Sequence, residues 1–314
     1  MNNAEPKRSA HMRAIFSLLV TITMWAVGPL FVRHFTGYYN LWTQNAFRYM
    51  CAATILLALG AWRGHLRYPL TARQRKKLLL VIGANILMQT NFAAMYYFIY
   101  PAVASLVTRL NIVFVTFLSF LIFKDERRVI KSPHFAGGAV MALVGAGLVV
   151  VGRDPELLAL LNVTEHDFWI GVGLAVVFAF FQSVYALTIR HAVSDIPALV
   201  SFTHVSWTTA LGLCVLMLVA GGVQDLWHQP ALPLALMALS ALLSIVIAHA
   251  FYYKALQHLK ASVSTSMLQL TPIITCFLSA LIYDEILTTT QITGGAAVIC
   301  GAWLAAVAQA KTEE

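Results

Sequence analysis

The sequence has few charged residues, and its acidic residues avoid the long apolar segments. Of its 314 residues, 11% are charged and 60% are apolar, and the mean hydropathy is +0.76. A soluble protein of this length could not cover so much apolar surface, so the sequence predicts an integral membrane protein. All 13 Asp and Glu residues fall in loops, tails or expected helix ends. Membrane proteins that export cations in exchange for protons usually need a buried carboxylate, so this absence argues against that class of protein.

Several chemical motifs are also missing. The sequence contains no G-x-x-x-x-G-K-[ST] loop, no H-E-x-x-H, no serine elbow and no pair of intramembrane carboxylates. The four cysteines lie inside apolar segments without the paired spacing of a metal site or a disulfide framework. We therefore expect no enzymatic activity, no cofactor and no metal, and a membrane-embedded enzyme is kept as the alternative from another class.

Ten apolar stretches approach the roughly 20 residues that a helix needs to cross the hydrocarbon core. They lie at about 14–32, 41–62, 78–97, 102–123, 135–151, 168–189, 198–220, 232–253, 262–283 and 291–310. Seventeen of the 21 Lys and Arg residues fall in tails and alternate connections on one side, against only Arg33 and Arg153 on the other. The positive-inside rule therefore predicts cytoplasmic termini in a multi-pass protein of the cytoplasmic (inner) membrane. The net charge of +8 follows this pattern rather than a nucleic-acid-binding face.

The C-terminal half of the chain repeats the N-terminal half. FLSFLIF at 117–123 returns as FLSALIY at 277–283, and the acidic pairs at 125–126 and 284–285 follow. Because each half has five spans, an odd number, the second half enters the membrane from the opposite side. The predicted fold is an all-α integral membrane protein with ten transmembrane helices in two inverted five-helix repeats, an arrangement typical of transporters. The expected parts are a cytoplasmic tail (1–13), the first repeat (14–151), an external connector (152–167), the second repeat (168–310) and a cytoplasmic tail (311–314).

These features resemble the drug/metabolite transporter superfamily, EamA-type branch, over almost the whole chain. The resemblance rests on the five-plus-five repeat and on the Asp-Glu pair that follows each fourth helix. Leu270-Thr271-Pro272 ahead of Glu285, Arg48 early in the second span and Gly137-Gly138 at the start of the fifth span are similar to the family pattern. The first half departs from it, with Leu110-Asn111-Ile112 where a proline is usual, so no kink is expected there. The resemblance implies a secondary carrier, often an exporter, that uses no ATP.

Polar residues inside the spans outline the expected transport pathway, because they are costly in hydrocarbon unless they face the protein interior or a wet cavity. Asn85, Gln89, Phe92 and Tyr96 form one stripe on the third span, at helical spacing. The expected substrate-binding residues come from spans one, three, four, six, eight and nine and are Trp25, Asn85, Gln89, Phe92, Tyr96, Arg109, Gln182, Tyr185, His249, Tyr252 and Gln269. Helix–helix hydrogen bonding without a ligand is the alternative for any one of them.

Arg109 is the sharpest single candidate, because it lies roughly 10 Å from the outer end of its span. Its guanidinium could face a wet vestibule, bind backbone carbonyls, snorkel to the surface, or receive a substrate carboxylate or phosphate through two hydrogen bonds. Arg48 is expected to be structural, and the acidic pairs are expected to bond to loop amides or basic neighbours. Proton coupling would have to use His249 or His204, the histidines well inside spans.

We therefore predict a secondary transporter that works by alternating access and moves a small metabolite such as an amino acid, with efflux as the expected direction. Its partners would be the substrate, the lipid bilayer and, if transport is coupled, protons, with no nucleic acid. The alternative within transport is a broad-specificity exporter of aromatic or quaternary-amine compounds, since aromatic faces bind such cations without a carboxylate.

Overall fold

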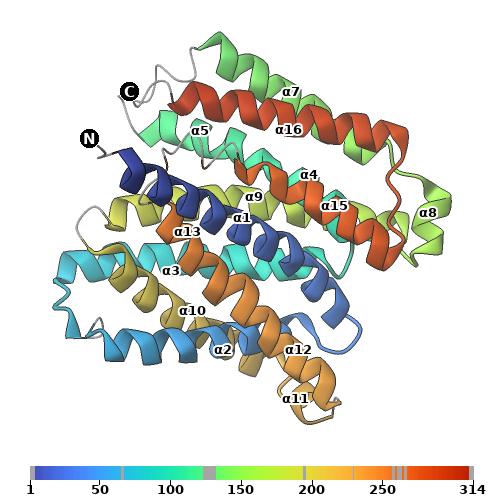
Figure 1. Ribbon diagram of the computed structural model, residues 1–314. Coiled ribbons are helices and arrows are strands. Elements are labelled where there is room, and N and C mark those ends of the chain that lie inside the picture. The colour runs from blue at the N-terminus through green and yellow to red at the C-terminus, as the bar shows by residue number, and fades with distance from the viewer. Residues whose placement is uncertain are drawn as a thin grey trace. The chain divides into compact units, whose positions relative to one another are not determined.

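The computed structural model describes residues 4–64, 67–122, 132–193, 196–228, 230–256, 259, 264 and 267–310, and its regular structure there is helical throughout (Figure 1). The chain forms two compact units, and each unit draws on both sequence halves. Unit 1 comprises Met1–Leu30, Tyr100–Asn162 and Leu243–Glu314, and unit 2 comprises Phe31–Ile99 and Val163–Leu242. The compact units therefore differ from the sequence repeats, whose predicted boundaries stay a prediction.

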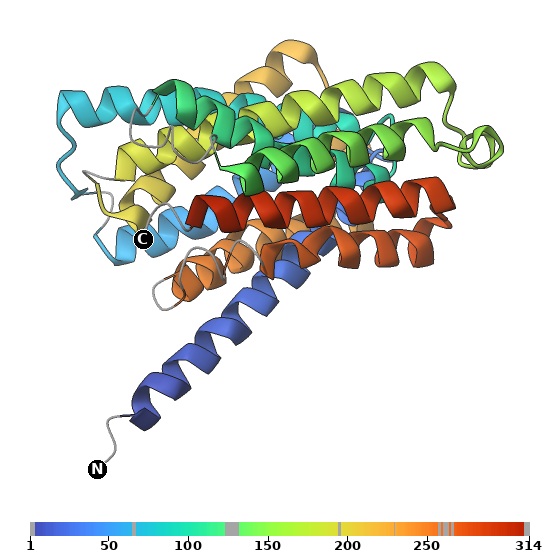
Figure 2. The same ribbon diagram turned by 90° about the horizontal axis from the view of Figure 1, so that it is seen from above.

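Unit 1 contains the helices of the first, fourth, fifth, ninth and tenth expected spans and part of the eighth. These elements are α1 (Ala4–Phe35, which continues into unit 2), α4 (Pro101–Val107), η2 (Thr108–Leu110), α5 (Asn111–Ile122), α7 (Pro133–Val151), α8 (Pro155–Leu160), η3 (Leu242–Ile247), α13 (Ala248–Leu256), α15 (Leu270–Tyr283) and α16 (Thr289–Ala310). Helices α7 and α16 lie side by side along most of their length (Figures 1 and 2).

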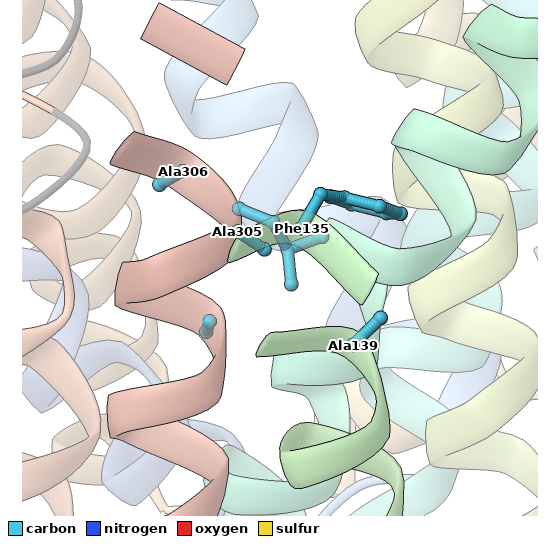
Figure 3. Close-up of a cluster of buried hydrophobic side chains, with 6 residues drawn as sticks. Phe135, Ala139, Ala305 and Ala306 are labelled. Atoms are coloured by element: carbon cyan, nitrogen blue, oxygen red, sulfur yellow. The ribbon is translucent and has the colours of Figure 1, made fainter. Parts of the chain in front are cut away.

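Glycines allow α7 and α16 to pack at backbone contact. A Cβ atom on Gly145 would lie 2.6 Å from the carbonyl oxygen of Gly294, and one on Gly138 would lie 2.6 Å from that of Gly301. Small residues at such positions let helices approach closely in a membrane. At the end of this contact where α7 begins, Phe135 and Ala139 of α7 belong to one buried cluster with Ala305 and Ala306 of α16 (Figure 3).

Unit 2 contains the helices of the second, third, sixth and seventh expected spans and the start of the eighth. They are α2 (Leu41–Trp62), α3 (Ala72–Met95), α9 (Glu165–Val193), α10 (Ala198–Ala220), α11 (Asp225–His228) and α12 (Ala231–Ala241). Helix α3 packs along α9, and α2 packs along α10. Leu78 and Val81 of α3 form a buried cluster with Val200 and Val205 of α10. The close approach of α2 to α10 is made at Gly60, where a Cβ atom would lie 2.8 Å from the methyl group of Thr203.

Eight helices in the described part of the chain are long and apolar enough to cross a membrane. They are Met12–Phe35, Ala72–Met95, Pro101–Ile122, Pro133–Val151, Glu165–Ile189, Val200–Ala220, Ala231–Tyr252 and Thr289–Val307. The other two expected spans correspond to α2, whose first half carries Gln44, Asn45 and Arg48, and to α15, which is 14 residues long. The count of ten spans and the cytoplasmic position of the termini stay predictions.

Three membrane helices depart from regular α geometry. The fourth span changes to a 3₁₀ turn at Thr108–Leu110, and the eighth span contains a π-helical segment at Leu242–Ile247. Helix α1 contains Pro29, which has no N–H to donate to the carbonyl one turn earlier. Irregular turns of this kind often mark functional positions, and two of them lie beside Arg109 and His249, which the sequence selects independently.

Candidate functional site

Three rings from two helices meet inside unit 1. The ring of Trp25 on α1 lies 5.3 Å from that of His249 and 5.0 Å from that of Tyr252, both on α13. The Nδ1 atom of His249 is 2.8 Å from the carbonyl oxygen of Ile245 in the π-helical segment. Because a carbonyl can only accept, this contact makes Nδ1–H the donor and orients the imidazole ring. All three residues were expected at the site, and the structure brings them together.

Helix α15 joins this ring cluster to the rest of unit 1. The hydroxyl of Thr275 donates to the carbonyl of Ala26 on α1 at 3.1 Å, one residue from Trp25. Tyr252 and Met267, which lies just before the start of α15, both pack against the buried cluster that contains Leu18 and Ile22 of α1. Gln269, the residue preceding α15, is buried. The predicted ligand-binding residues of spans one, eight and nine therefore all belong to unit 1, and α15 bonds to α1 next to Trp25.

Arg109 belongs to the same unit and lies in the 3₁₀ turn of the fourth span. Ser105, one turn before Arg109, places its Oγ 3.8 Å from the Sγ atom of Cys276 on α15. Cys276 follows Gln269 by seven residues, about two helical turns, so both side chains lie on the same side of α15. Arg109 therefore lies one turn beyond a residue that contacts α15, and Gln269 directly precedes the first residue of α15.

The buried polar residues of unit 2 bond chiefly to one another. Asn85 on α3, 5% exposed, donates from Nδ2 to the hydroxyl of Thr209 on α10 at 3.0 Å. The side chain of Asn85 also hydrogen-bonds to that of Tyr49 on α2. Arg48, 3% exposed, donates from Nε to the hydroxyl of Ser240 on α12 at 3.1 Å. These contacts link neighbouring helices, which is the role expected of Arg48 and the alternative that was kept for Asn85.

The other predicted residues of unit 2 lie on α3 and α9. The ring of Phe92 is 5.2 Å from that of Tyr96 and 5.4 Å from that of Phe178 on α9. Tyr96 is fully buried, and its carbonyl accepts a hydrogen bond of 2.7 Å from Arg33. Gln89, Gln182 and Tyr185 are half-buried on the same two helices.

The structure therefore separates the predicted site residues into two groups, each within one compact unit. Unit 1 holds Trp25, Arg109, His249, Tyr252 and Gln269, and unit 2 holds Asn85, Gln89, Phe92, Tyr96, Gln182 and Tyr185. In the described ranges, no group of three or more His, Cys, Asp and Glu side chains could hold a metal ion.

Sequence reasoning missed one buried ionisable residue in unit 1, Glu285. Its side chain is 3% exposed although it follows the end of α15. It accepts hydrogen bonds from the backbone amides of Ala102 and Val103. These amides belong to the first turn of α4, so the expectation of loop amides or basic neighbours was only partly right. The equivalent pair at 125–126, with the basic residues 127 and 128, lies outside the described residues.

Comparison with known proteins supports transport as the activity. The chain matches the model of the EamA-like transporter family twice, over residues 12–151 and 169–307. A relative from Haemophilus influenzae, described as an uncharacterized transporter, is 25% identical over 302 residues, which cover 92% of this chain and 93% of the relative. A protein with a solved crystal structure shares the fold with a TM-score of 0.63 at 20% identity, over 96% of this chain and 99% of its own. The family resemblance and the repeat found in the sequence are thereby confirmed.

Proposed function

Because the chain belongs to the EamA-like transporter family, we propose that it is a secondary transporter for a small metabolite that carries a carboxylate, with amino acids as the first class to test. It would work by alternating access in the cytoplasmic membrane, through ten spans with both termini in the cytoplasm. Export is the direction that the resemblance favours.

The observation that carries this proposal is the presence of a guanidinium and an aromatic cluster in the same compact unit. Arg109 offers the planar donor set that binds a carboxylate through two hydrogen bonds. The rings of Trp25 and Tyr252 offer apolar walls that suit a hydrocarbon or aromatic side chain. Gln269 adds an amide that can both donate and accept. A small zwitterion or anion with an apolar end fits these groups better than a bare cation does.

One observation favours a second candidate within transport. The ring of Trp25 on α1 lies within 5.3 Å of the rings of His249 and Tyr252 on α13, and aromatic faces bind quaternary ammonium groups without a carboxylate. A broad exporter of aromatic or quaternary amines would use these rings and would not need Arg109. The carboxylate candidate therefore predicts that removing the guanidinium weakens ligand binding, and the aromatic candidate predicts no change in binding.

The test is thermal unfolding of the detergent-purified protein with a ligand panel at about pH 6 and about pH 8, followed by its tryptophan fluorescence. The panel holds amino acids, nucleobases, organic anions and quaternary amines. Three of its members share a phenyl ring: 3-phenylpropionate carries a carboxylate, phenethylamine an amine, and benzyltrimethylammonium a quaternary amine. A ligand at about 100 times its Kd adds about 2.7 kcal/mol of stability, which shifts the midpoint visibly.

The proposal expects stabilisation by 3-phenylpropionate in the wild type, loss of that effect in Arg109→Gln, and no loss in the control Arg153→Gln. Arg153 provides the same change of charge in the connector outside the spans. Stabilisation by the two amines alone, unchanged in Arg109→Gln, would reject the carboxylate proposal and support the aromatic one. Turnover of a bound compound would instead indicate an enzyme.

A further inference from the structure

Glu285 connects the end of α15 to the beginning of α4. Its Oε2 atom accepts a hydrogen bond of 2.7 Å from the amide of Ala102, and Oε1 accepts one of 3.1 Å from Val103. The hydroxyl of Ser279, on the last turns of α15, donates to the same Oε2 atom. The carboxylate thus has three donors from two helices that are far apart in sequence.

The chemistry of a helix start explains why a carboxylate is stable at this place. The first amides of a helix have no partner within the helix and carry the positive end of its dipole. Pro101 has no N–H, so Ala102 and Val103 provide the first donors of α4. A carboxylate that bonds to such amides makes charge-assisted hydrogen bonds, which are shorter and stronger than neutral ones.

A second set of contacts holds the end of α15 in place. The hydroxyl of Tyr283, the last residue of α15, donates to the carbonyl of Leu30 on α1 at 2.6 Å. Its ring lies 5.6 Å from that of Tyr100, the residue before α4. Asp284 then adopts a left-handed backbone conformation, with φ of 54°, which turns the chain so that Glu285 follows. The carboxylate therefore projects from a fixed point toward α4.

The fixed start of α4 has a consequence two turns further along. Arg109 follows Ala102 by seven residues, roughly 10 Å along the helix axis. Between them the regular hydrogen bonding of α4 gives way to the 3₁₀ turn that contains Arg109. The turn itself packs against α7 and α16, and α4 packs against α15, so where α4 begins helps to set where Arg109 lies among these helices. Ser105, between the start of α4 and Arg109, places its Oγ atom 3.8 Å from the Sγ atom of Cys276, so α4 packs against α15 over this stretch.

We propose that Glu285 is a positioning residue for Arg109: its hydrogen bonds to the first amides of α4 fix where the Arg109 guanidinium lies. This inference rests on the proposed function, in which Arg109 receives the substrate carboxylate. Glu285 itself does not contact the substrate. It sets the place of the group that does.

The test compares Glu285→Gln with Asp284→Asn in the full-length protein. The first substitution keeps the size of the side chain but removes its charge and replaces one acceptor oxygen by a donor. The second removes the neighbouring, exposed carboxylate, and asparagine tolerates the left-handed conformation of that position. Ser279→Ala, which removes only the hydroxyl donor, serves as a milder variant if Glu285→Gln fails to fold.

The first measurement is hydrogen–deuterium exchange in lipid nanodiscs, which needs no ligand. In Glu285→Gln, exchange is expected to rise about tenfold across residues 102–111, whereas Asp284→Asn should match the wild type. Faster exchange confined to residues 102–104 would show that Glu285 only caps the helix start, and this would overturn the inference. In Ser279→Ala, a smaller rise over the same residues is expected.

The second measurement is the Kd of 3-phenylpropionate and of phenethylamine, from tryptophan fluorescence. Glu285→Gln and Arg109→Gln should each weaken binding of 3-phenylpropionate about tenfold and leave phenethylamine within about twofold. A normal Kd in Glu285→Gln together with a tenfold loss in Arg109→Gln would also overturn the inference. If Arg109→Gln has no effect on either ligand, the proposed function fails and the exchange data alone decide the role of Glu285.

Discussion

The backbone contact between α7 and α16 predicts that a Gly→Ala substitution lowers the free energy of unfolding at the contact and raises it away from the contact. In Gly145→Ala, the new Cβ atom would lie 2.6 Å from the carbonyl oxygen of Gly294 and 2.6 Å from the amide nitrogen of Val298. In Gly147→Ala, on the same helix, the Cβ atom would have no atom within 4 Å. The two variants therefore share the change in helix propensity and differ only in what the methyl group meets.

The expected magnitude follows from these distances. Replacing a mid-helix glycine by alanine stabilises a helix by about 1 kcal/mol, so Gly147→Ala should raise the free energy of unfolding by up to that amount. An ordinary contact of a Cβ atom begins at 3.4 Å, so Gly145→Ala must separate the helices by about 0.8 Å. A gap of that size removes a quarter to a half of each dispersion contact across the interface. Overpacking typically costs 1 to 3 kcal/mol. Set against the gain of up to about 1 kcal/mol in helix propensity, this makes Gly145→Ala up to about 2 kcal/mol less stable than the wild type and about 1 to 3 kcal/mol less stable than Gly147→Ala.

The assay is thermal unfolding of both variants and the wild type in one detergent, with refolding yield checked by size exclusion. We expect the highest unfolding midpoint for Gly147→Ala, an intermediate one for the wild type and the lowest for Gly145→Ala. A Gly145→Ala variant as stable as Gly147→Ala would show that α7 and α16 do not pack at backbone contact, and it would refute the argument.

Three further predictions follow from other parts of the molecule. Ser240→Ala removes the hydroxyl that accepts from buried Arg48 and should lower the free energy of unfolding by about 1 to 3 kcal/mol, measured by thermal unfolding. If protons drive transport, His249→Gln in liposomes should abolish the dependence of uptake on a pH gradient, because a glutamine amide cannot take up and release a proton as an imidazole can. Single cysteines added at both termini should react with an impermeant maleimide only after the cytoplasmic face is exposed.

Much of the fold could be predicted because long apolar runs in the sequence predict membrane helices. The repeat of FLSFLIF as FLSALIY carried the family assignment, which the match over 12–151 and 169–307 confirms. The glycines at 145 and 294 are of the residue type that permits close helix packing in a membrane, and the structure places them at backbone contact. The division of the chain into units that mix both repeats could not be predicted, since periodicity gives the polar face of a helix but not the helix that it meets.

The candidate site was predictable in its residue types and less so in its contacts. Trp25 and His249 meet as expected, because both lie on polar faces of neighbouring helices. Asn85 has the same sequence signature, yet it bonds to Thr209 inside unit 2. Glu285 was placed outside the membrane helices correctly, but its partners on α4 lie 183 and 182 residues away in the chain. Local sequence carries no signal for a contact over that separation.

The most direct test of the central claim is uptake of radiolabelled 3-phenylpropionate into liposomes that contain the wild type, Arg109→Gln or Arg153→Gln. The account predicts saturable uptake by the wild type and by Arg153→Gln. It also predicts a KM raised about tenfold in Arg109→Gln, because the guanidinium that binds the carboxylate is gone. Equal KM values in all three proteins, or uptake of benzyltrimethylammonium alone, would contradict the account.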